Sequence, residues 1–296
     1  MIMRWKSSAI ALILTLFLFS CTTATTQTQS NVVPVQQLPK TSAKRVVALS
    51  SLSADIISQL DQTKLVGITG STLFKNNPKL QDIPRVSEGR SVPNLEKIVS
   101  LKPDLVIGAA GFSDVTIQKI KQLGIATLST KVNNWQSLEE LTKSLAESID
   151  VDPQPLLNRY KTFLPANATQ NISALVLVSR QPILTPNKNS WAGDLISRFG
   201  AKNIAAELQG NSPIGGYVTL SAEKVLEANP EVLIVVNAEP TLLDSLKKEP
   251  FWQQLQATKN NRVYVFDYYG LVNPGSLETI EKASLELKKI FVAKEI

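Results

Sequence analysis

The feature that most constrains the fold of this chain is a segment that occurs twice. Residues 96–107 read EKIVSLKPDLVI and residues 223–234 read EKVLEANPEVLI, and the two align without a gap. A second matched pair precedes each of them, ADIIS at 54–58 and GDLIS at 193–197. Two matched pairs in the same order in each half predict a duplicated structural unit.

Each copy lies within an alternation of short apolar strands and amphipathic helices. We expect strands near 46–49, 65–68, 104–107 and 126–128 in the first half, and near 174–178, 218–219, 232–236 and 263–266 in the second. Helices are expected near 53–60, 94–101 and 114–122, then near 192–199, 222–227, 241–246 and 276–291. This alternation is typical of βαβ units, so the sequence predicts an α/β fold with two Rossmann-like lobes built on parallel sheets.

A helical stretch separates the two halves. Leu138, Leu141, Leu145 and Ile149 keep one apolar face, while Asp152-Pro153 indicates a break or the start of a second helix. We therefore expect an N-terminal lobe at 44–132, a helical connector at 133–165 and a C-terminal lobe at 166–296.

The N-terminus has the layout of an export signal. Arg4 and Lys6 precede an almost uninterrupted apolar run, which ends at Ser20-Cys21. The run is shorter than the roughly 20 apolar residues that span a bilayer. Leu18-Phe19-Ser20-Cys21 resembles a bacterial lipobox, in which the cysteine is lipidated. We expect a signal peptide at 1–20, a lipid on Cys21 and a polar tether over 21–43. An ordinary signal peptide with an unmodified cysteine is the alternative.

Composition excludes several classes of function. The chain has no His and one Cys, and its net charge of +6 falls to +4 once Arg4 and Lys6 are removed. Nucleic-acid binding is not expected, because no clustered basic stripe is present. A Ser-His-Asp or Cys-His mechanism requires His, and no G-x-S-x-G elbow or phosphate-binding G-x-x-x-x-G-K-[ST] occurs. We predict no enzymatic activity, no resident metal and no cofactor.

Together these segments resemble the substrate-binding proteins of ABC importers for siderophores, haem and cobalamin, the class III periplasmic binding proteins with a rigid helical connector. The resemblance covers about 45–292 and rests on RVVALS at 45–50, PNLEK at 93–97, KPDLV at 102–106, GDL at 193–195, FW at 251–252 and RVYVFD at 262–267. It implies a ligand cleft between the lobes. Loops after the strands are expected to line it: 50–53, 90–92 and 109–113, then 179–191, 211–217, 237–240 and 267–273.

The resemblance, with this loop placement, nominates ligand-contacting residues. Arg90 matches an arginine that contacts the ligand in iron–hydroxamate binding proteins, and a guanidinium suits anionic oxygens. Phe112 stands where that group has a tyrosine, so the hydroxyl is lost. The further candidates share positions in or beside the expected cleft loops: Ser51, Arg180, Trp191, Tyr217, Tyr268 and Tyr269. Ordinary packing or surface exposure is the alternative for each of them.

Glu96 and Glu223 occupy the same position in the two copies of the repeat. In the family, one glutamate on each lobe pairs with permease arginines, which guides docking. A purely structural role at a helix start is compatible with this. The expected partners are an ABC permease dimer, a small siderophore and, through the lipid, the membrane. We expect a monomer in the periplasm or on the outer face of the cytoplasmic membrane.

The leading hypothesis is a lipoprotein that captures a ferric siderophore, with iron arriving only inside the chelate. Cobalamin is the alternative ligand, because aromatic residues suit a corrinoid as well. Haem is less favoured, since only Tyr or Met would remain as likely axial ligands. An envelope α/β enzyme using a carboxylate pair is a distant alternative, and an adhesive or structural lipoprotein is a third.

Overall fold

A computed structural model describes residues 42–75, 77–89, 91–168, 171–208, 212, 214–239 and 241–292. The expected signal peptide, Cys21, nearly all of the expected tether and Arg90 lie outside these residues. Within the described ranges, no helix combines the length and the apolar character needed to cross a membrane.

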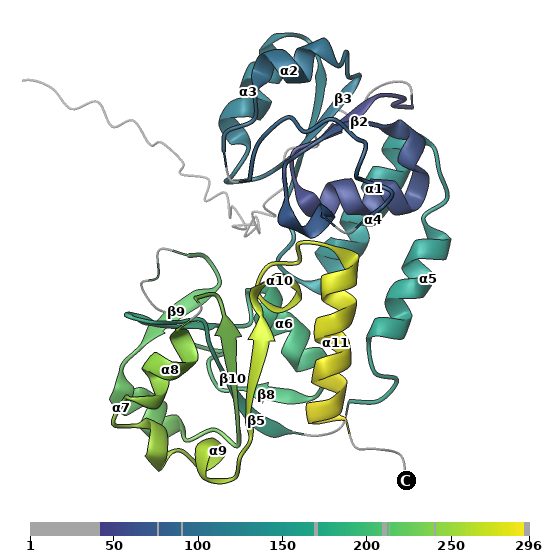
Figure 1. Ribbon diagram of the computed structural model, residues 1–296. Helices are drawn as coiled ribbons and strands as arrows, with labels where there is room; N and C mark the ends of the chain where they lie inside the picture. Colours follow the sequence, from purple (N-terminus) through teal and green to yellow (C-terminus); the bar gives the residue numbers. More distant parts are fainter. Residues whose placement is uncertain are drawn as a thin grey trace, which may run out of the picture. The chain divides into compact units, whose positions relative to one another are not determined.

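The first lobe is a four-stranded parallel sheet flanked by helices (Figure 1). Its strands are β1 (Val46–Ala48), β2 (Leu65–Ile68), β3 (Leu105–Ala109) and β4 (Ala126–Thr130). They lie in the order β2-β1-β3-β4, and every neighbouring pair is parallel. The helical segments are α1 (Ser51–Asp61), η1 (Gln62–Lys64), η2 (Thr72–Phe74), α2 (Leu95–Ser100) and α3 (Asp114–Gln122).

The second lobe contains a second four-stranded parallel sheet. Its strands are β5 (Ile172–Leu177), β8 (Ala201–Asn203), β10 (Val232–Asn237) and β11 (Val263–Asp267), in the order β11-β10-β5-β8. Its helical segments are α6 (Trp191–Arg198), α7 (Ala222–Ala228), α8 (Leu242–Lys247), η3 (Trp252–Gln254), α9 (Gln256–Lys259) and α10 (Tyr268–Leu271).

The two sheets have the same strand order, which confirms the two-lobed α/β fold and the duplication. In chain order, β1, β2, β3 and β4 correspond to β5, β8, β10 and β11. The repeated segments form α2–β3 and α7–β10. Lys102 and Asn229, the residues before the two repeated prolines, both have positive φ, of 48° and 36°. The sequence repeat therefore extends to the backbone conformation that ends each helix.

Three short strands form a separate antiparallel sheet in the second lobe. They are β6 (Ser179–Arg180), β7 (Ile183–Pro186) and β9 (Tyr217–Leu220), in the order β6-β7-β9. The sequence analysis treated 179–191 as one cleft loop and placed the strand near 218 in the parallel sheet, and both expectations are wrong. Residues 183–186 pair with 217–220, a long-range pairing that no local pattern reveals.

Side chains alternate between two sides of each parallel sheet. In β3, Leu105 and Ile107 join a core shared by both lobes, whereas Val106 packs towards α2 and α3. In β10 the shared core takes Val232, Ile234 and Val236, while the intervening Leu233 and Val235 pack with α7, α8 and the segment around Trp252. This period of two follows from strand geometry.

Three further helices contribute to the shared core. They are α4 (Trp135–Ile149), α5 (Gln154–Phe163) and α11 (Leu277–Phe291). Helix α4 ends before Asp150, which has a left-handed φ of 59°, and Asp152, next to the Pro153 N-cap of α5, accepts from Gln154 N at 2.9 Å. By position, α4 follows the last strand of the first lobe as α11 follows the last strand of the second, which leaves α5 without a repeat partner.

Candidate functional site

Three of the expected ligand-contacting residues follow parallel strands, whereas Arg180 and Tyr217 lie in strands β6 and β9 of the antiparallel sheet. In parallel sheets the loops after the strands meet at one edge. Ser51 follows β1, Phe112 follows β3, and Tyr268 follows β11. The fold thus provides an equivalent edge in each lobe, and the individual side chains at these edges differ sharply in exposure.

Among the described residues, Phe112 has the most exposed large apolar side chain, at 91%. It lies in the turn between β3 and α3, where Gly111 has a left-handed φ of 83° and its N–H donates to Asp114 Oδ2 at 3.0 Å. The phenyl ring is thus fully available for contact with another molecule at the end of a central strand.

Ser51 is the first residue of α1 and is half-buried. The preceding Ser50 is the N-cap, and its Oγ accepts from Ser53 N at 3.2 Å and donates to Ser53 Oγ at 2.8 Å. The cap orients the first helical turn at the end of β1. Ser51 therefore has a fixed backbone position at the strand edge.

Arg180 is already paired. Its Nε donates to Glu249 Oε1 at 2.5 Å, and the side chains of Arg180 and Glu249 are 38% and 23% exposed. The carboxylate compensates most of the charge that Arg180 would offer to an anionic ligand. The sequence analysis missed Glu249, because the two residues are 69 positions apart and no motif links them.

Trp191 is enclosed, with only 3% of its surface exposed. Its Nε1 donates to Gly270 O at 2.8 Å, and its ring stacks on Trp135 with centroids 6.0 Å apart. All its polar capacity is satisfied inside the protein. This environment gives Trp191 a packing role at the base of the expected site.

Tyr217 and Tyr268 are neighbours in the second lobe. Tyr217 is 9% exposed, and burial, followed by the proximity of Tyr268, raises the pKa of its hydroxyl. Tyr268 is half-buried, and its ring meets that of Tyr269 edge-on with centroids 5.4 Å apart. The group offers aromatic surface that carries phenolic hydroxyls.

Arg85 is a cation that the sequence analysis did not nominate. Its backbone forms an isolated parallel β-bridge with Ile68 at the end of β2, and its guanidinium lies 5.4 Å from the centre of the Phe74 ring. Its Nη1 is buried without a hydrogen-bond partner among the described residues, and burial lowers its pKa. Because the signal is an unsatisfied donor, only three-dimensional packing could have identified it.

Glu96 and Glu223 are the second residues of α2 and α7, and both are exposed. Asn94 and Ser221 cap these helices by accepting from Lys97 N at 2.9 Å and Lys224 N at 3.3 Å. The pKa of Glu223 is lowered by a hydrogen bond from the Ser221 hydroxyl. The two carboxylates therefore have matching places in the two lobes.

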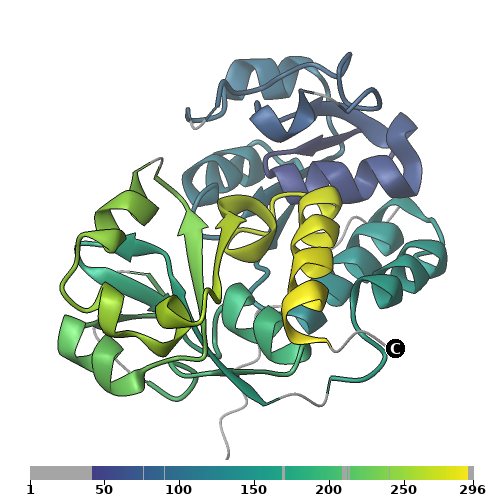
Figure 2. The same cartoon turned by 60° about the horizontal axis from the view of Figure 1, so that its bottom comes forward.

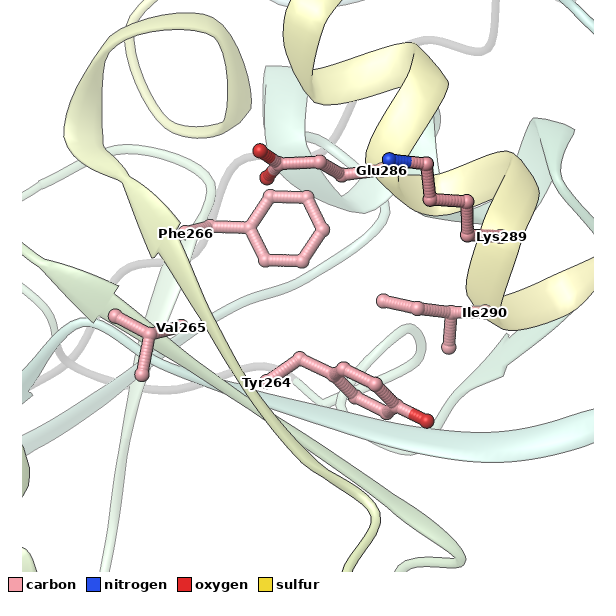
Figure 3. A pocket seen from close by; sticks show the side chains of 6 residues that line it. All are labelled: Tyr264, Val265, Phe266, Glu286, Lys289 and Ile290. Atoms are coloured by element: carbon pink, nitrogen blue, oxygen red, sulfur yellow. The ribbon is translucent and has the colours of Figure 1, made fainter.

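A shallow pocket of about 190 Å³ lies elsewhere, between β11 and α11 (Figure 3). Its lining consists of Tyr264, Val265, Phe266, Glu286, Lys289 and Ile290. Small-molecule sites usually occupy about 300–1,000 Å³. The pocket is smaller than that and contains none of the nominated ligand residues.

Comparison with known proteins defines the class. Residues 46–269 match the family model described as periplasmic binding protein, and the chain belongs to that family. It is 28% identical over 250 residues to an uncharacterized ABC transporter substrate-binding lipoprotein, YvrC, of Bacillus subtilis, covering 77% of this chain and 74% of that protein. It is 25% identical to the Fe(3+)-citrate-binding protein YfmC of the same species, covering 84% and 81%.

Two further comparisons bear on the ligand and the fold. The Vitamin B12-binding protein of Vibrio cholerae is 25% identical over 83% of this chain and 90% of its own length. The crystal structure of a possible iron-binding periplasmic protein from Staphylococcus epidermidis superposes with a TM-score of 0.72 at 18% identity, covering 86% of this chain and all of that one. The chain is thus a substrate-binding protein of an ABC transporter, and the two curated relatives named for a ligand bind Fe(3+)-citrate and vitamin B12.

Proposed function

We propose that this protein captures a ferric siderophore between the strand edges of its two lobes and delivers the intact complex to an ABC permease. The observation that carries the proposal is the phenyl ring of Phe112, 91% exposed at the end of β3. The hydroxyls of Tyr217 and Tyr268 and the cations Arg85 and Arg180 add the few polar groups that such a site needs. Arg90 stays a prediction, since it lies outside the described residues.

Cobalamin is the second candidate ligand. The Vitamin B12-binding relative supports it to the same degree of identity, 25%, as the Fe(3+)-citrate-binding relative supports an iron complex. The pairing of Arg180 with Glu249 also favours a ligand of low charge. Ferric siderophores remain the leading proposal because the segment around the predicted contact residue Arg90 resembles that of iron–hydroxamate binding proteins.

A titration of the full-length protein in detergent distinguishes these ligands. Tryptophan fluorescence is followed while a ferric hydroxamate, a ferric catecholate, ferric citrate or cobalamin is added. Saturable binding of a ferric complex supports the proposal, whereas saturation by cobalamin alone transfers it to the alternative. Mass spectrometry of the recovered ligand adds a second criterion. Conversion of the ligand to a product would identify an enzyme and overturn the transport function.

The two exposed glutamates extend the proposal to the permease. Glu96 and Glu223 are held at the starts of equivalent helices, so they can contact two equivalent subunits of a permease dimer. The double variant Glu96→Ala with Glu223→Ala is expected to bind ligand normally and to lose most ligand uptake in cells. Glu147→Ala, which removes an exposed carboxylate from α4, is the matched control. Normal uptake by the double variant would refute the docking role.

The membrane anchor is part of the same proposal. Relatives are envelope lipoproteins, and Cys21 is the only cysteine of the chain. We expect Cys21→Ser to move the protein from the membrane fraction to the soluble envelope fraction. Retention of that variant in the membrane would show that another segment anchors the chain.

A further inference from the structure

The second repeated sequence pair places an aspartate at the same position in each lobe. Asp55 lies in α1, the first helix after β1, and Asp194 lies in α6, which is equivalent because it precedes β8 as α1 precedes β2. Neither residue takes part in the ligand capture proposed above. Each of them nevertheless accepts a hydrogen bond from the first backbone N–H of a long helix.

Asp55 contacts the helix that follows the last strand of the other lobe. Its Oδ2 accepts a hydrogen bond from Leu277 N, the first residue of α11, at 2.7 Å. Asp55 is 4% exposed, so this bond is made away from water. The start of α11 and helix α1 are adjacent in both views (Figures 1 and 2).

Asp194 makes the reciprocal contact. Its Oδ2 accepts from Trp135 N, the first residue of α4, at 2.8 Å. Helix α4 follows β4, the last strand of the first lobe. Asp194 also accepts from Arg198 Nε at 2.8 Å within its own helix. Each lobe therefore uses the carboxylate of its first helix to hold the start of the other lobe's last helix.

The two recipient helices are built alike. Both α4 and α11 have 15 residues and begin with a reciprocal capping box, Asn134 with Ser137 and Ser276 with Thr279. A capping box satisfies the N–H of the third helical residue but leaves the first N–H without a partner. The aspartate of the opposite lobe accepts from that first N–H, where the helix dipole favours a negative charge.

Apolar contacts accompany each carboxylate. At one junction the Trp135 ring stacks on Trp191 at an interplanar angle of 17°. At the other, Gly275 approaches Leu73 so closely that a β-carbon on Gly275 would lie 2.6 Å from Leu73 Cδ1. Apolar packing thus accompanies the carboxylate at both junctions.

We infer that Asp55 and Asp194 are a reciprocal pair of positioning residues that hold the two lobes in a single orientation. Because both junctions depend on that orientation, they are thermodynamically coupled, and opening one of them loosens the other. A pair of independent helix caps would show no such coupling. The consequence for ligand release, in addition, rests on the proposed function.

Hydrogen exchange measured by mass spectrometry on the full-length protein tests the coupling directly. Asp194→Ala is expected to raise exchange at least tenfold in 135–138 and also severalfold in 277–280, the start of the other helix. Asp55→Ala is expected to show the converse pattern. Asp55→Asn should exchange no faster than the wild type, since its amide oxygen can accept the same bond. A change confined to each variant's own junction, or an Asp55→Asn variant that behaves like Asp55→Ala, overturns the inference.

Matched controls separate the interlobe bonds from other contacts. Arg198→Ala removes the ion pair of Asp194 and keeps its bond to Trp135, so 277–280 should stay protected. Asp61→Ala changes an aspartate at the other end of α1, where the Asp61 side chain caps η1 by accepting from Thr63 N and Thr63 Oγ1. If Asp55→Ala does not fold, Asp194→Ala decides the question alone, because its side chain is 23% exposed and tolerates replacement.

Release of ferric citrate and of cobalamin, followed by stopped-flow fluorescence, tests the functional consequence. For a probe that binds the wild type, Asp194→Ala should release it at least threefold faster, and Arg198→Ala at the wild-type rate. Unchanged release with altered exchange would refute the effect on the ligand. If neither these probes nor the other chelates bind the wild type, the proposed function fails, while the exchange data still decide the coupling.

Discussion

Replacing Phe112 by Ala is the sharpest test of where the ligand binds. The ring is 91% exposed in the free protein, so its removal should change the free energy of unfolding by no more than about 0.5 kcal/mol. A phenylalanine side chain has roughly 150–250 Å² of surface. A ligand that covers half of it removes roughly 100 Å² from water, which at about 25 cal/mol per Å² contributes about 2.5 kcal/mol.

Alanine keeps only the β-carbon, so most of that contribution is lost. We expect Phe112→Ala to weaken binding by about 2 kcal/mol, which corresponds to roughly a 30-fold higher Kd. The assay is the fluorescence titration with the four ligand classes, combined with chemical denaturation to confirm unchanged stability. Phe112→Tyr should retain the affinity, because the ring is preserved, and should favour a ferric hydroxamate if the added hydroxyl reaches the chelate.

Leu123→Ala is the matched control for this prediction. Leu123 lies at the opposite end of α3 from Phe112 and is 56% exposed. The substitution Leu123→Ala therefore removes exposed apolar surface near the same helix without changing the strand edge. If Phe112→Ala and Leu123→Ala bind the preferred ligand equally well, the exposed ring does not contact it, and the reasoning from exposure to binding fails.

Three further predictions follow from single contacts. Trp191→Phe loses the hydrogen bond to Gly270 O and leaves that acceptor unpaired, so unfolding should require about 1–3 kcal/mol less in a urea titration; a smaller loss would show that the bond is replaced by water. Glu249→Gln frees Arg180 from its ion pair and should tighten ferric citrate binding if Arg180 faces the ligand; unchanged affinity would exclude that role. Burial raises the pKa of Asp55, whose charged neighbours are Arg159 and Glu278 and which also lies near Tyr160. The protonated carboxyl therefore stabilises the fold below its unfolded pKa, and this contribution is lost as the pH rises through its folded pKa. Asp55→Asn should therefore gain stability relative to the wild type as the pH rises above the unfolded pKa of about 4, at about 1.4 kcal/mol per unit of pKa shift, and a pH-independent difference would contradict the raised pKa.

The sequence analysis predicted the repeated core of the fold because its signals are local. Proline after a short helix, followed by an apolar strand, marks α2–β3 and α7–β10 in the same way. The left-handed residues before each proline, Lys102 and Asn229, show that this punctuation has one structural cause. The antiparallel sheet escaped prediction because β6 has two residues and β7 and β9 have four each, too few for a clear periodicity to appear.

Candidate site residues were harder to predict than strands, because exposure depends on packing between distant segments. Phe112 and Trp191 are both aromatic residues next to a strand end, yet one is 91% exposed and the other 3%. The difference arises from the contact of α6 with α4 and α10, which encloses Trp191, whereas the turn before α3 projects away from such neighbours. Sequence position alone therefore marks both residues as candidates for ligand contact but does not predict which of them is exposed.

The aspartate pair illustrates a stricter limit. The sequence displays the match between ADIIS and GDLIS, so it shows that Asp55 and Asp194 occupy equivalent positions. It cannot show what they bind, because both partners are backbone N–H groups, of Leu277 and Trp135, and nearly every residue type carries such a group. A bond from a side chain to the backbone constrains only one of its two residues.

If the two junctions are coupled as inferred, positions 55 and 194 should tolerate Asn or Asp and reject Ala, while positions 135 and 277 should accept any apolar side chain that packs. An activity screen of libraries at these four positions would therefore separate a lock built on side-chain-to-backbone bonds from one built on apolar packing, in which 135 and 277 would be the restricted positions.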